Sequence, residues 1–459
     1  MTETNLPLEA IDRSSVLHPF TNLKQFASGA LGDPRIMVGG AGIRVRDRNG
    51  RESIDGFSGL YCTNVGYGRT EIADAIHNQA ASLAYYHSYA GHSSEPAILL
   101  TQKILALAPA NMERVFFGLS GSDANETQVK LIWYYNNVLG RPNKKKIISR
   151  HRGYHGATIM AGSLTGLPFY HQAFDLPLPL VLHTTAPHAL WLAEPGMSER
   201  AFSQRCADDL EALIEVEGAD TIAAFIAEPV LGTGGLIPPP EGYWDAIQPV
   251  LRRHDIVLIA DEVVCGFGRV GENFGSDLYG MEPDLITVAK GLTSAYLPLS
   301  ASIVSSKICA ILEQASDTLG AFSHGYTYTA HPVCAAAGLA NLAIIERENL
   351  TENARETGAY FQAVMKQAFA GRPHVAEVRG VGLLGAIEFA QDPDARVRFD
   401  APLTIGAKVS AACLENGLIA RAMPNGDILG FAPPLIVNRA DIDEIVDKAL
   451  DAVKQVLPG

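Results

Sequence analysis

The chain has 459 residues, of which 47% are hydrophobic and 19% charged, so it can build one large or two moderate packed domains and is neither fibrous nor disordered. Its formal net charge of -14 argues against a nucleic-acid or anionic-membrane surface, because both need clustered Lys and Arg. The 6 cysteines lack metal or redox spacing. With no signal-like leader and no apolar run near the ~18 residues of a membrane span, we expect a soluble, cytoplasmic protein with reduced thiols.

The first predicted element is a hairpin. The run IRVRDRNGRESIDG at residues 43–56 alternates apolar and polar side chains on both sides of Asn49 and Gly50, which is a strong turn signal. We expect this hairpin to belong to a small domain.

From about residue 70, short apolar runs alternate with helical patterns. Such runs are typical of strands buried on both faces of a mainly parallel sheet, where ligands gather at the strand ends. The runs are RVFFG at 114–118, KKIISR at 145–150, TIAAFIAEP at 221–229, IVLIADEV at 256–263, LITVAK at 285–290 and ASIVSS at 301–306.

The pattern changes again after His331 and Pro332. The run VCAAAGLANLAIIERE predicts a long helix, VRGVGLLGAIEF predicts a second hairpin, and the C-terminus reads as helix, strand and amphipathic helix. We therefore expect an α/β protein with a large domain at residues 70–335. A smaller α+β domain would combine residues 1–69 with residues 336–459.

Two strand ends carry residues that point to one cofactor. Lys290 follows the strand LITVA, and Asp261 ends the strand IVLIA. Pyridoxal phosphate (PLP) needs an amine to form a Schiff base and a carboxylate to keep its pyridine nitrogen protonated. The pair therefore predicts a PLP site and carbanion chemistry.

Ser120, Gly121 and Ser122 lie between a strand and a helix that begins near Asp123. Free backbone amides at a helix start, together with a Ser hydroxyl, bind phosphate well, although an ordinary capped helix has the same pattern. Beside Asp261 and Lys290, we interpret the segment as a phosphate site.

The loop HRGYHGAT places Tyr154 where its ring could lie against a planar cofactor, with Val263 on the other face. His151 and His155 have the spacing of a helical metal site, but Gly153 argues against a helix and no third ligand is evident, so we expect no metal. The GTGG segment at 232–235 lacks the full GxGxxG spacing and predicts a turn, which argues against a nicotinamide dehydrogenase.

Together these residues resemble the class III aminotransferases of PLP fold type I, and specifically the (S)-selective amine:pyruvate or omega-transaminases. The likeness covers nearly the whole chain, in the order HPFTNLKQF, DGFSGLYCTNVGYGR, SGSDANET, GYHGAT, AEPVLGTGG, ADEVVCGFGR, AKGLTSAYLPL, HGYTYTAHPVCAAA and GLIARAMPNGDILGFAPPL. It implies a seven-stranded large-domain sheet and a homodimer with shared active sites. It does not decide between dimer and tetramer.

The resemblance also implies individual roles. Lys290 would form the Schiff base and move the proton, and Asp261 would pair with the ring nitrogen. The cofactor would further contact Ser120, Gly121, Ser122, Tyr154, Glu228, Val263 and, from the neighbouring chain, Thr327. The substrate pocket would be formed by Phe20, Tyr61, Tyr89, Tyr154, Thr233 and Arg421. Arg421 would pair with a substrate carboxylate and swing away for uncharged amines.

Departures from related subfamilies indicate the acceptor. Thr233 stands where ornithine- or 4-aminobutyrate-type relatives carry a Glu, and Val264 stands where they tend to have Gln; both favour pyruvate over 2-oxoglutarate. Tyr61 replaces a frequent Trp and Leu119 replaces a common Asn, which leaves acceptor breadth and cofactor retention open.

We therefore expect transfer of an amino group from a primary amine or omega-amino acid to pyruvate by a ping-pong mechanism. The alternatives are an aminomutase, a decarboxylase, a 2-oxoglutarate-dependent omega-amino acid aminotransferase, or a binding protein that has lost the chemistry.

Overall fold

The computed structural model describes residues 7–458 and has a seven-stranded sheet at its centre, with the strand order β4-β10-β9-β8-β7-β5-β6. β10 runs antiparallel to both of its neighbours, and the other neighbouring pairs are parallel. The strands are β4 (Met112–Gly118), β5 (Lys146–Arg150), β6 (Val181–Thr184), β7 (Ile222–Ala227), β8 (Val257–Asp261), β9 (Leu285–Val288) and β10 (Ser300–Ser305). The expected mainly parallel sheet is confirmed.

Each of the apolar runs predicted as strands overlaps one of these strands. The sequence pattern misses only the edge strand β6, whose four residues VLHT are too short and too polar to stand out. β7, β8 and β9 are buried along their whole length, which explains why their sequences are continuously apolar rather than alternating.

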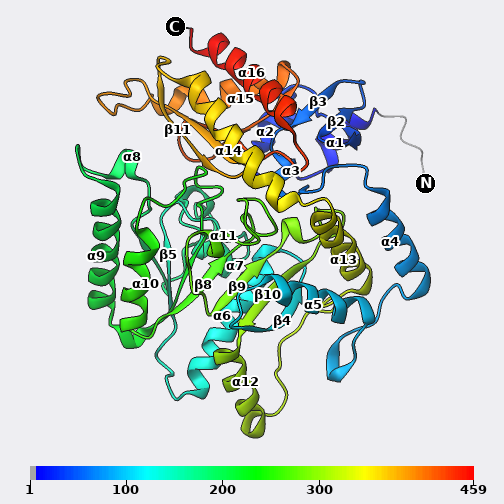
Figure 1. The fold of residues 1–459 in the computed structure, drawn as a ribbon, viewed down its shortest axis with the longest axis vertical. Coiled ribbons are helices and arrows are strands. Elements are labelled where there is room, and N and C mark those ends of the chain that lie inside the picture. The colour runs from blue at the N-terminus through cyan, green and yellow to red at the C-terminus, as the bar shows by residue number, and fades with distance from the viewer. Residues whose placement is uncertain (1–6, 459) are drawn as a thin grey trace.

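Helices flank the sheet (Figure 1). α6 packs against β10 and β9, and α9 and α10 pack on each other next to β6 and β8. The helices around the sheet are α4 (Thr70–Ser82), α5 (Glu95–Leu107), α6 (Gly121–Val138), α7 (Ile159–Leu164), α8 (Ala189–Leu192), α9 (Glu199–Glu217), α10 (Tyr243–Arg253), α11 (Gly275–Leu278), α12 (Ser306–Leu319) and α13 (Pro332–Arg347). α13 is the long helix predicted after His331.

Two four-stranded sheets lie at one end of the molecule, with the orders β1-β2-β3-β13 and β11-β12-β15-β14 (Figure 1). Their strands are β1 (Met37–Ala41), β2 (Arg44–Asp47), β3 (Glu52–Asp55), β11 (Val375–Val381), β12 (Leu384–Phe389), β13 (Leu418–Ile419), β14 (Arg421–Ala422) and β15 (Ile428–Phe431). Both predicted hairpins, β2-β3 and β11-β12, are antiparallel pairs.

β13 pairs in parallel with β3, so segments from the two ends of the chain share one sheet. The remaining helices of this part are α3 (Ser58–Tyr61), α14 (Leu350–Phe369), α15 (Ile405–Glu415) and α16 (Arg439–Val456). The domain boundaries at residues 69/70 and 335/336 stay a prediction.

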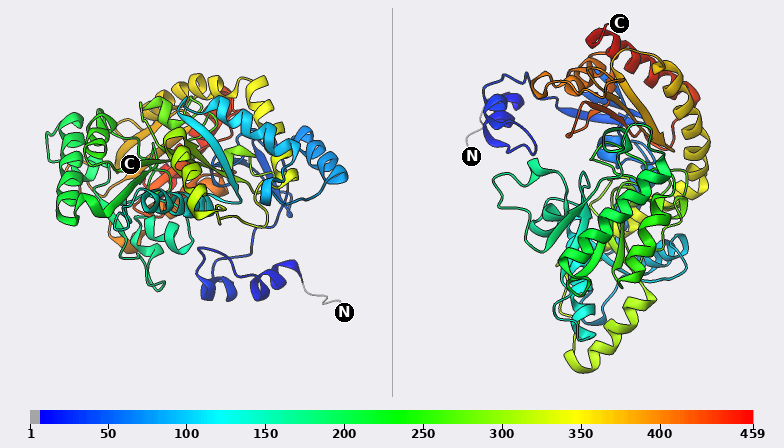
Figure 2. Two further views of the ribbon diagram at one scale, coloured as in Figure 1. Left: turned by 90° about the horizontal axis from the view of Figure 1, so that it is seen from below. Right: turned by 90° about the vertical axis from the view of Figure 1, so that its left-hand side faces the viewer.

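The N-terminal helices α1 (Leu8–Ser15) and α2 (Leu23–Ala27) lie beside the main body (Figure 2). α1 buries none of its residues. Among the helices of residues 7–458, none is both long enough and apolar enough to cross a membrane.

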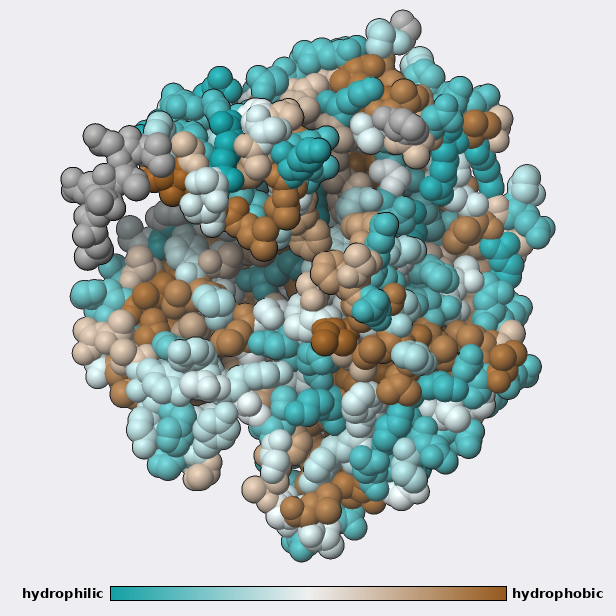
Figure 3. All heavy atoms as spheres, turned by 180° about the vertical axis from the view of Figure 1, so that it is seen from behind, coloured by the Kyte–Doolittle hydropathy of each residue, from teal (hydrophilic) through white to brown (hydrophobic). Residues whose placement is uncertain are grey.

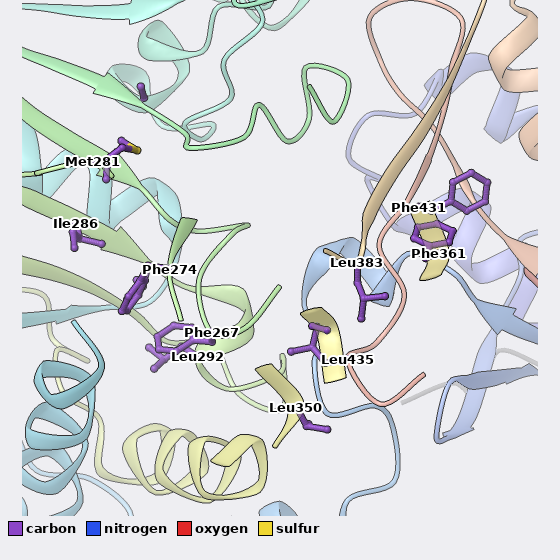
Figure 4. Packing of buried hydrophobic residues seen from close by; sticks show 14 of the residues in the cluster. Phe267, Phe274, Met281, Ile286, Leu292, Leu350, Phe361, Leu383, Phe431 and Leu435 are labelled. Atoms are coloured by element: carbon purple, nitrogen blue, oxygen red, sulfur yellow. The ribbon is translucent and has the colours of Figure 1, made fainter. Parts of the chain in front are cut away.

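One hydrophobic cluster joins the central sheet to the small sheets (Figure 4). Ile286 and Leu292 belong to the central part, whereas Phe361 and Phe431 come from α14 and β15, and all are buried. Burial of each such side chain contributes ~1.5–3 kcal/mol. The shared core therefore fixes β14, which carries Arg421, relative to the strand ends that carry Asp261 and Lys290.

Candidate active site

A cavity of about 410 Å³ opens where β4, β8 and β9 end and α6 begins. Its wall includes many of the residues that the sequence analysis selects, namely Ser120, Gly121, Ser122, Tyr154, Glu228, Asp261, Val263 and Lys290. Leu119 and Val264, two of the positions that depart from related subfamilies, also line it. Residues from five separate segments thus meet in one hollow, as expected at the carboxyl ends of parallel strands.

Lys290 follows β9 and opens a short 3-10 turn over Lys290–Leu292. Its φ of +38° is unusual for a residue with a side chain, and such backbone strain persists only where the surroundings enforce it. Its Nζ lies 5.8 Å from the centre of the Tyr61 ring. The turn therefore holds a half-buried amine in the cavity wall.

Asp261 ends β8 with only 3% of its surface exposed. Asn125 Nδ2 donates to its Oδ2 over 2.9 Å, and His155 Nδ1 lies 2.8 Å from the same oxygen. The Val263 amide donates to Oδ1 over 3.2 Å. These three contacts fix the orientation of the carboxylate, and the sequence pattern assigns no such role to Asn125 or His155.

The two histidines with the spacing of a helical metal site have different partners. His155 faces Asp261, whereas the His151 ring stacks on His183 with 5.5 Å between ring centres. His155 therefore helps to orient the Asp261 carboxylate, while the His151 ring packs elsewhere.

The start of α6 is built as an anion cup. Ser120 is the N-cap: its Oγ accepts the Asp123 amide, and Asp123 Oδ1 accepts the Ser120 amide in return. The amides of Gly121 and Ser122 in the first turn remain free to bind an anion, and the helix dipole favours negative charge there. A Cβ on Gly121 would come within 3.0 Å of Val263, so the glycine keeps this cup open.

Glu228 joins two loops of the wall. Its Oε1 accepts the Tyr154 amide at 3.0 Å and its Oε2 accepts the Gly232 amide at 2.7 Å. Burial raises the pKa of this carboxyl. The Tyr154 loop and the turn with Thr233 are therefore held at a fixed separation. Thr233 itself is buried in that turn and does not line the main cavity.

Arg421 lies near three tyrosines. Its guanidinium is 5.6 Å from the centre of the Phe57 ring. Burial raises the pKa of Tyr61, Tyr154 and Tyr170, to about 12 for Tyr170, and the Arg421 charge opposes that rise in each case. Arg421 thus places a positive charge near these aromatic residues.

An aromatic path leads from the cavity wall to the N-terminal segment. Tyr154 packs on Tyr170 with 5.4 Å between ring centres, and Tyr170 packs on Phe20 at 5.2 Å. Phe20 is 74% exposed and does not line the cavity. Sequence reasoning misses Tyr170, because the segment GLPFYHQ has no periodic pattern; only its aromatic content, next to Pro168, is a usable signal.

Tyr89 and Thr327 lie together on a different part of the surface. Tyr89 lines a separate hollow with Gly325, and Thr327 is exposed, with its carbonyl accepting the Tyr85 hydroxyl at 2.6 Å. Neither residue lines the cavity of its own chain. Figure 3 shows the face of the molecule opposite to that in Figure 1, and on this face hydrophobic side chains lie around a hollow.

The residues in the cavity match the three chemical needs of PLP. An amine (Lys290), an oriented carboxylate (Asp261) and a helix-start anion cup (Ser120 to Ser122) line one hollow. Tyr154 and Val263 supply a ring and a branched apolar side chain from separate loops. The donor set therefore fits this cofactor, whose chemistry depends on those groups.

Comparison with known proteins agrees with the family resemblance seen in the sequence. Residues 29–453 match the family model for Aminotransferase class-III. An uncharacterized aminotransferase of Sinorhizobium fredii is 60% identical over 446 residues, which cover 97% of this chain and 96% of that protein. A diaminobutyrate–2-oxoglutarate transaminase of Halomonas elongata is 59% identical over 447 residues, covering 97% and 95%.

A solved structure is similar along its whole length. The omega-transaminase from Pseudomonas jessenii in complex with PMP superposes with a TM-score of 0.95 at 42% identity, covering 99% of this chain and 100% of that one.

Proposed function

This chain belongs to the class III aminotransferases, enzymes of PLP fold type I that use PLP, and we propose that it transfers an amino group from a primary amine or omega-amino acid to pyruvate, giving alanine. The observation that carries the proposal is that Arg421 and Lys290 lie on the same aromatic pair: the Arg421 guanidinium is 5.6 Å from the Phe57 ring, Phe57 packs on Tyr61 with 4.4 Å between ring centres, and the Lys290 amine is 5.8 Å from the Tyr61 ring. This arrangement supplies one carboxylate partner next to an aromatic wall.

When bound, PLP supplies an electron sink that stabilises negative charge at the substrate carbon. Lys290 Nζ would hold the cofactor carbonyl and, once released, move a proton at the reacting carbon. Asp261, held by Asn125 and His155, would keep the pyridine nitrogen protonated. The amides and hydroxyls at Ser120, Gly121 and Ser122 would hold the phosphate, while Tyr154 and Val263 would enclose the ring.

The distribution of charge supports a monocarboxylate acceptor. Among the residues that line the cavity in the described chain, Lys290 is the only Lys or Arg, and Glu228 and Asp261 are acidic. Arg421 adds one further cation near the aromatic wall. Pyruvate needs one such partner, whereas 2-oxoglutarate needs a second cation for its distal carboxylate.

We further propose a homodimer with shared active sites. Tyr89 and Thr327 lie together away from the cavity of their own chain, on a surface with the exposed aromatic residues Tyr85, Tyr86 and Tyr328. Exposed apolar patches of this kind mark association surfaces. In the proposed dimer, Thr327 of one chain would reach the phosphate site of the other.

A second candidate acceptor is 2-oxoglutarate, because the Halomonas elongata relative with 59% identity carries 2-oxoglutarate in its name. Single-turnover assays separate the two. The amine-loaded enzyme would be mixed with equal concentrations of pyruvate and 2-oxoglutarate, and alanine and glutamate would be quantified. We expect alanine to dominate for a panel of amine donors; a dominant glutamate product would replace pyruvate with 2-oxoglutarate as the acceptor.

A further inference from the structure

Two buried arginines hold the turn that carries Thr233. Three consecutive carbonyls of this turn accept hydrogen bonds from guanidinium groups. Arg152 Nε donates to Gly234 O over 2.8 Å. Arg379 Nη2 donates to Gly235 O over 2.7 Å, and its Nε donates to Leu236 O over 3.2 Å. The turn is therefore held from outside by side chains of two different parts of the fold.

Arg152 also reaches the segment that follows Arg421. Its Nη2 donates to the carbonyl of Asn425 over 2.8 Å, between β14 and β15. Arg152 itself stands two residues before Tyr154. One side chain thus links the Tyr154 loop, the Thr233 turn and the Arg421 segment. The planar fork of Arg can serve two carbonyls at once, which a Lys ammonium on a flexible stem does less well.

A buried charge next to these elements needs compensation. Burial lowers the pKa of Arg152 to about 10, and the Glu388 carboxylate opposes that change. Glu388 lies 2.6 Å from Arg379 Nη1, accepts the Trp191 indole N–H and lies 3.2 Å from His188. Glu388 therefore pairs directly with Arg379, and its charge also favours the protonated form of Arg152.

The same cluster does not need a metal ion. Ligand atoms of His188, Glu377 and Glu388 lie within 4.8 Å of one another, a spacing that a cation could use. Arg379 Nη1 already lies 2.5 Å from Glu377 and 2.6 Å from Glu388. The guanidinium supplies the positive charge, so the cluster acts as an anchor for Arg379.

We propose that Arg152 is a positioning residue: it fixes the backbone of the Arg421 segment against the Thr233 turn and thereby sets the preference of the enzyme for substrates that carry a carboxylate. The inference rests on the proposed role of Arg421. A guanidinium that switches between substrates needs a fixed backbone, because a displacement of about 1 Å can cost on the order of 100-fold in rate. Arg152 supplies that fixed point through Asn425.

The test compares half-reactions of Arg152→Gln with those of the parent enzyme, in the PLP-loaded protein. Single-turnover absorbance gives kcat/KM for alanine, which has a carboxylate, and for benzylamine, which has none. We expect the alanine-to-benzylamine ratio to fall about tenfold. Arg152→Lys keeps the charge and loses the fork, and should lower the ratio as well. The matched control is Arg396→Gln, since Arg396 donates to the Ala193 carbonyl and not to any of the three segments that Arg152 joins, and it should leave the ratio unchanged.

A double-mutant cycle with Arg421→Ala separates positioning from general destabilisation. In the Arg421→Ala background, Arg152→Gln should lower the ratio no further. An unchanged ratio in Arg152→Gln, an equal loss for both amines, or a full additional loss in the Arg421→Ala background would each overturn the inference. If Arg421→Ala alone leaves the ratio unchanged, the proposed role of Arg421 fails and this inference fails with it. Should Arg152→Gln not fold, Arg152→Lys provides the same comparison.

Discussion

The proposed cofactor cradle and the proposed substrate wall are built in different ways. The cradle, formed by Ser120 to Ser122, Asp261 and Lys290, lies on strand ends and a helix start of the central sheet. The proposed substrate wall consists of Thr233, Tyr170 and Arg421, none of which is among the residues that line the main cavity; it comes from a turn, a short 3-10 segment and a two-residue strand of a small sheet. On this proposal, regular elements hold the chemistry that every substrate shares, and short or irregular segments held by side-chain contacts determine the specificity.

The means of support differ as well. The cradle is fixed mainly by contacts within the central part, such as the capping box of α6 and the bonds from Asn125 and His155 to Asp261. The wall depends on contacts that cross from the central sheet to the small sheets, such as the bond from Arg152 to Asn425. Substitutions in the cradle should therefore remove activity for all substrates, and substitutions in the wall should change the ratio between substrates.

The largest effect is expected for Lys290→Ala. Turnover should fall by several orders of magnitude for every donor, because the variant loses both the covalent amine and the proton carrier. PLP binding should persist in part through the anion cup and Asp261. Single-turnover absorbance and cofactor retention after gel filtration measure the two effects, with Lys307→Ala as a control lysine that pairs with Asp284. Substantial transamination by Lys290→Ala, in the absence of any added amine that could replace the lost lysine side chain, would exclude the assigned role.

Asp261→Asn should give the next largest loss. An amide of nearly the same shape keeps the fold but no longer stabilises a protonated pyridine nitrogen, so the amine half-reaction should slow on the order of 100-fold, the size typical of removing one preorganised electrostatic contact. Stopped-flow absorbance of the first half-reaction measures this. The loss should be similar for alanine and for uncharged amines, and an unchanged rate would argue against the ring-nitrogen role.

Arg421→Ala should lower kcat/KM for some substrates much more than for others. A charge-assisted, bidentate contact is worth about 1.5 to 3 kcal/mol, or roughly ten- to a hundredfold. The variant should therefore lose that factor in kcat/KM for alanine and pyruvate and much less for benzylamine, each half-reaction being measured alone. Equal losses in both would give Arg421 a structural role and would remove the contrast between cradle and wall.

The same contrast explains which residues the sequence predicts. Lys290, Asp261 and the Ser120 segment follow strands whose apolar runs are visible in the sequence, so their meeting point follows from the order of strands and helices. Tyr170, His155 and Arg152 cannot be assigned in this way, because their roles arise from contacts between irregular segments that the sequence pattern does not bring together. The expected α/β fold, the family and the cofactor are confirmed, whereas the pyruvate preference and the individual residue roles stay predictions.

The smallest expected effect is on the stability of the folded protein in acid, and it comes from His183 on the edge strand β6. Burial, together with the neighbouring His151 and His171, lowers the pKa of His183 to about 4. The folded state thus keeps this imidazole neutral while the unfolded chain takes up a proton below about pH 6.5. The stability that depends on the neutral ring is complete above pH 6.5 and is lost as the pH falls toward 4.

Replacement of His183 by Gln, which does not titrate, should remove this part of the acid sensitivity. Urea unfolding at pH 8, 6, 5 and 4 should show a smaller decline for His183→Gln than for the parent, by about 1 to 3 kcal/mol, with no change in activity at pH 8. The exposed His77, replaced by Gln, is the control and should follow the parent curve. Parallel curves for His183→Gln and the parent would show that another group governs the loss of stability in acid.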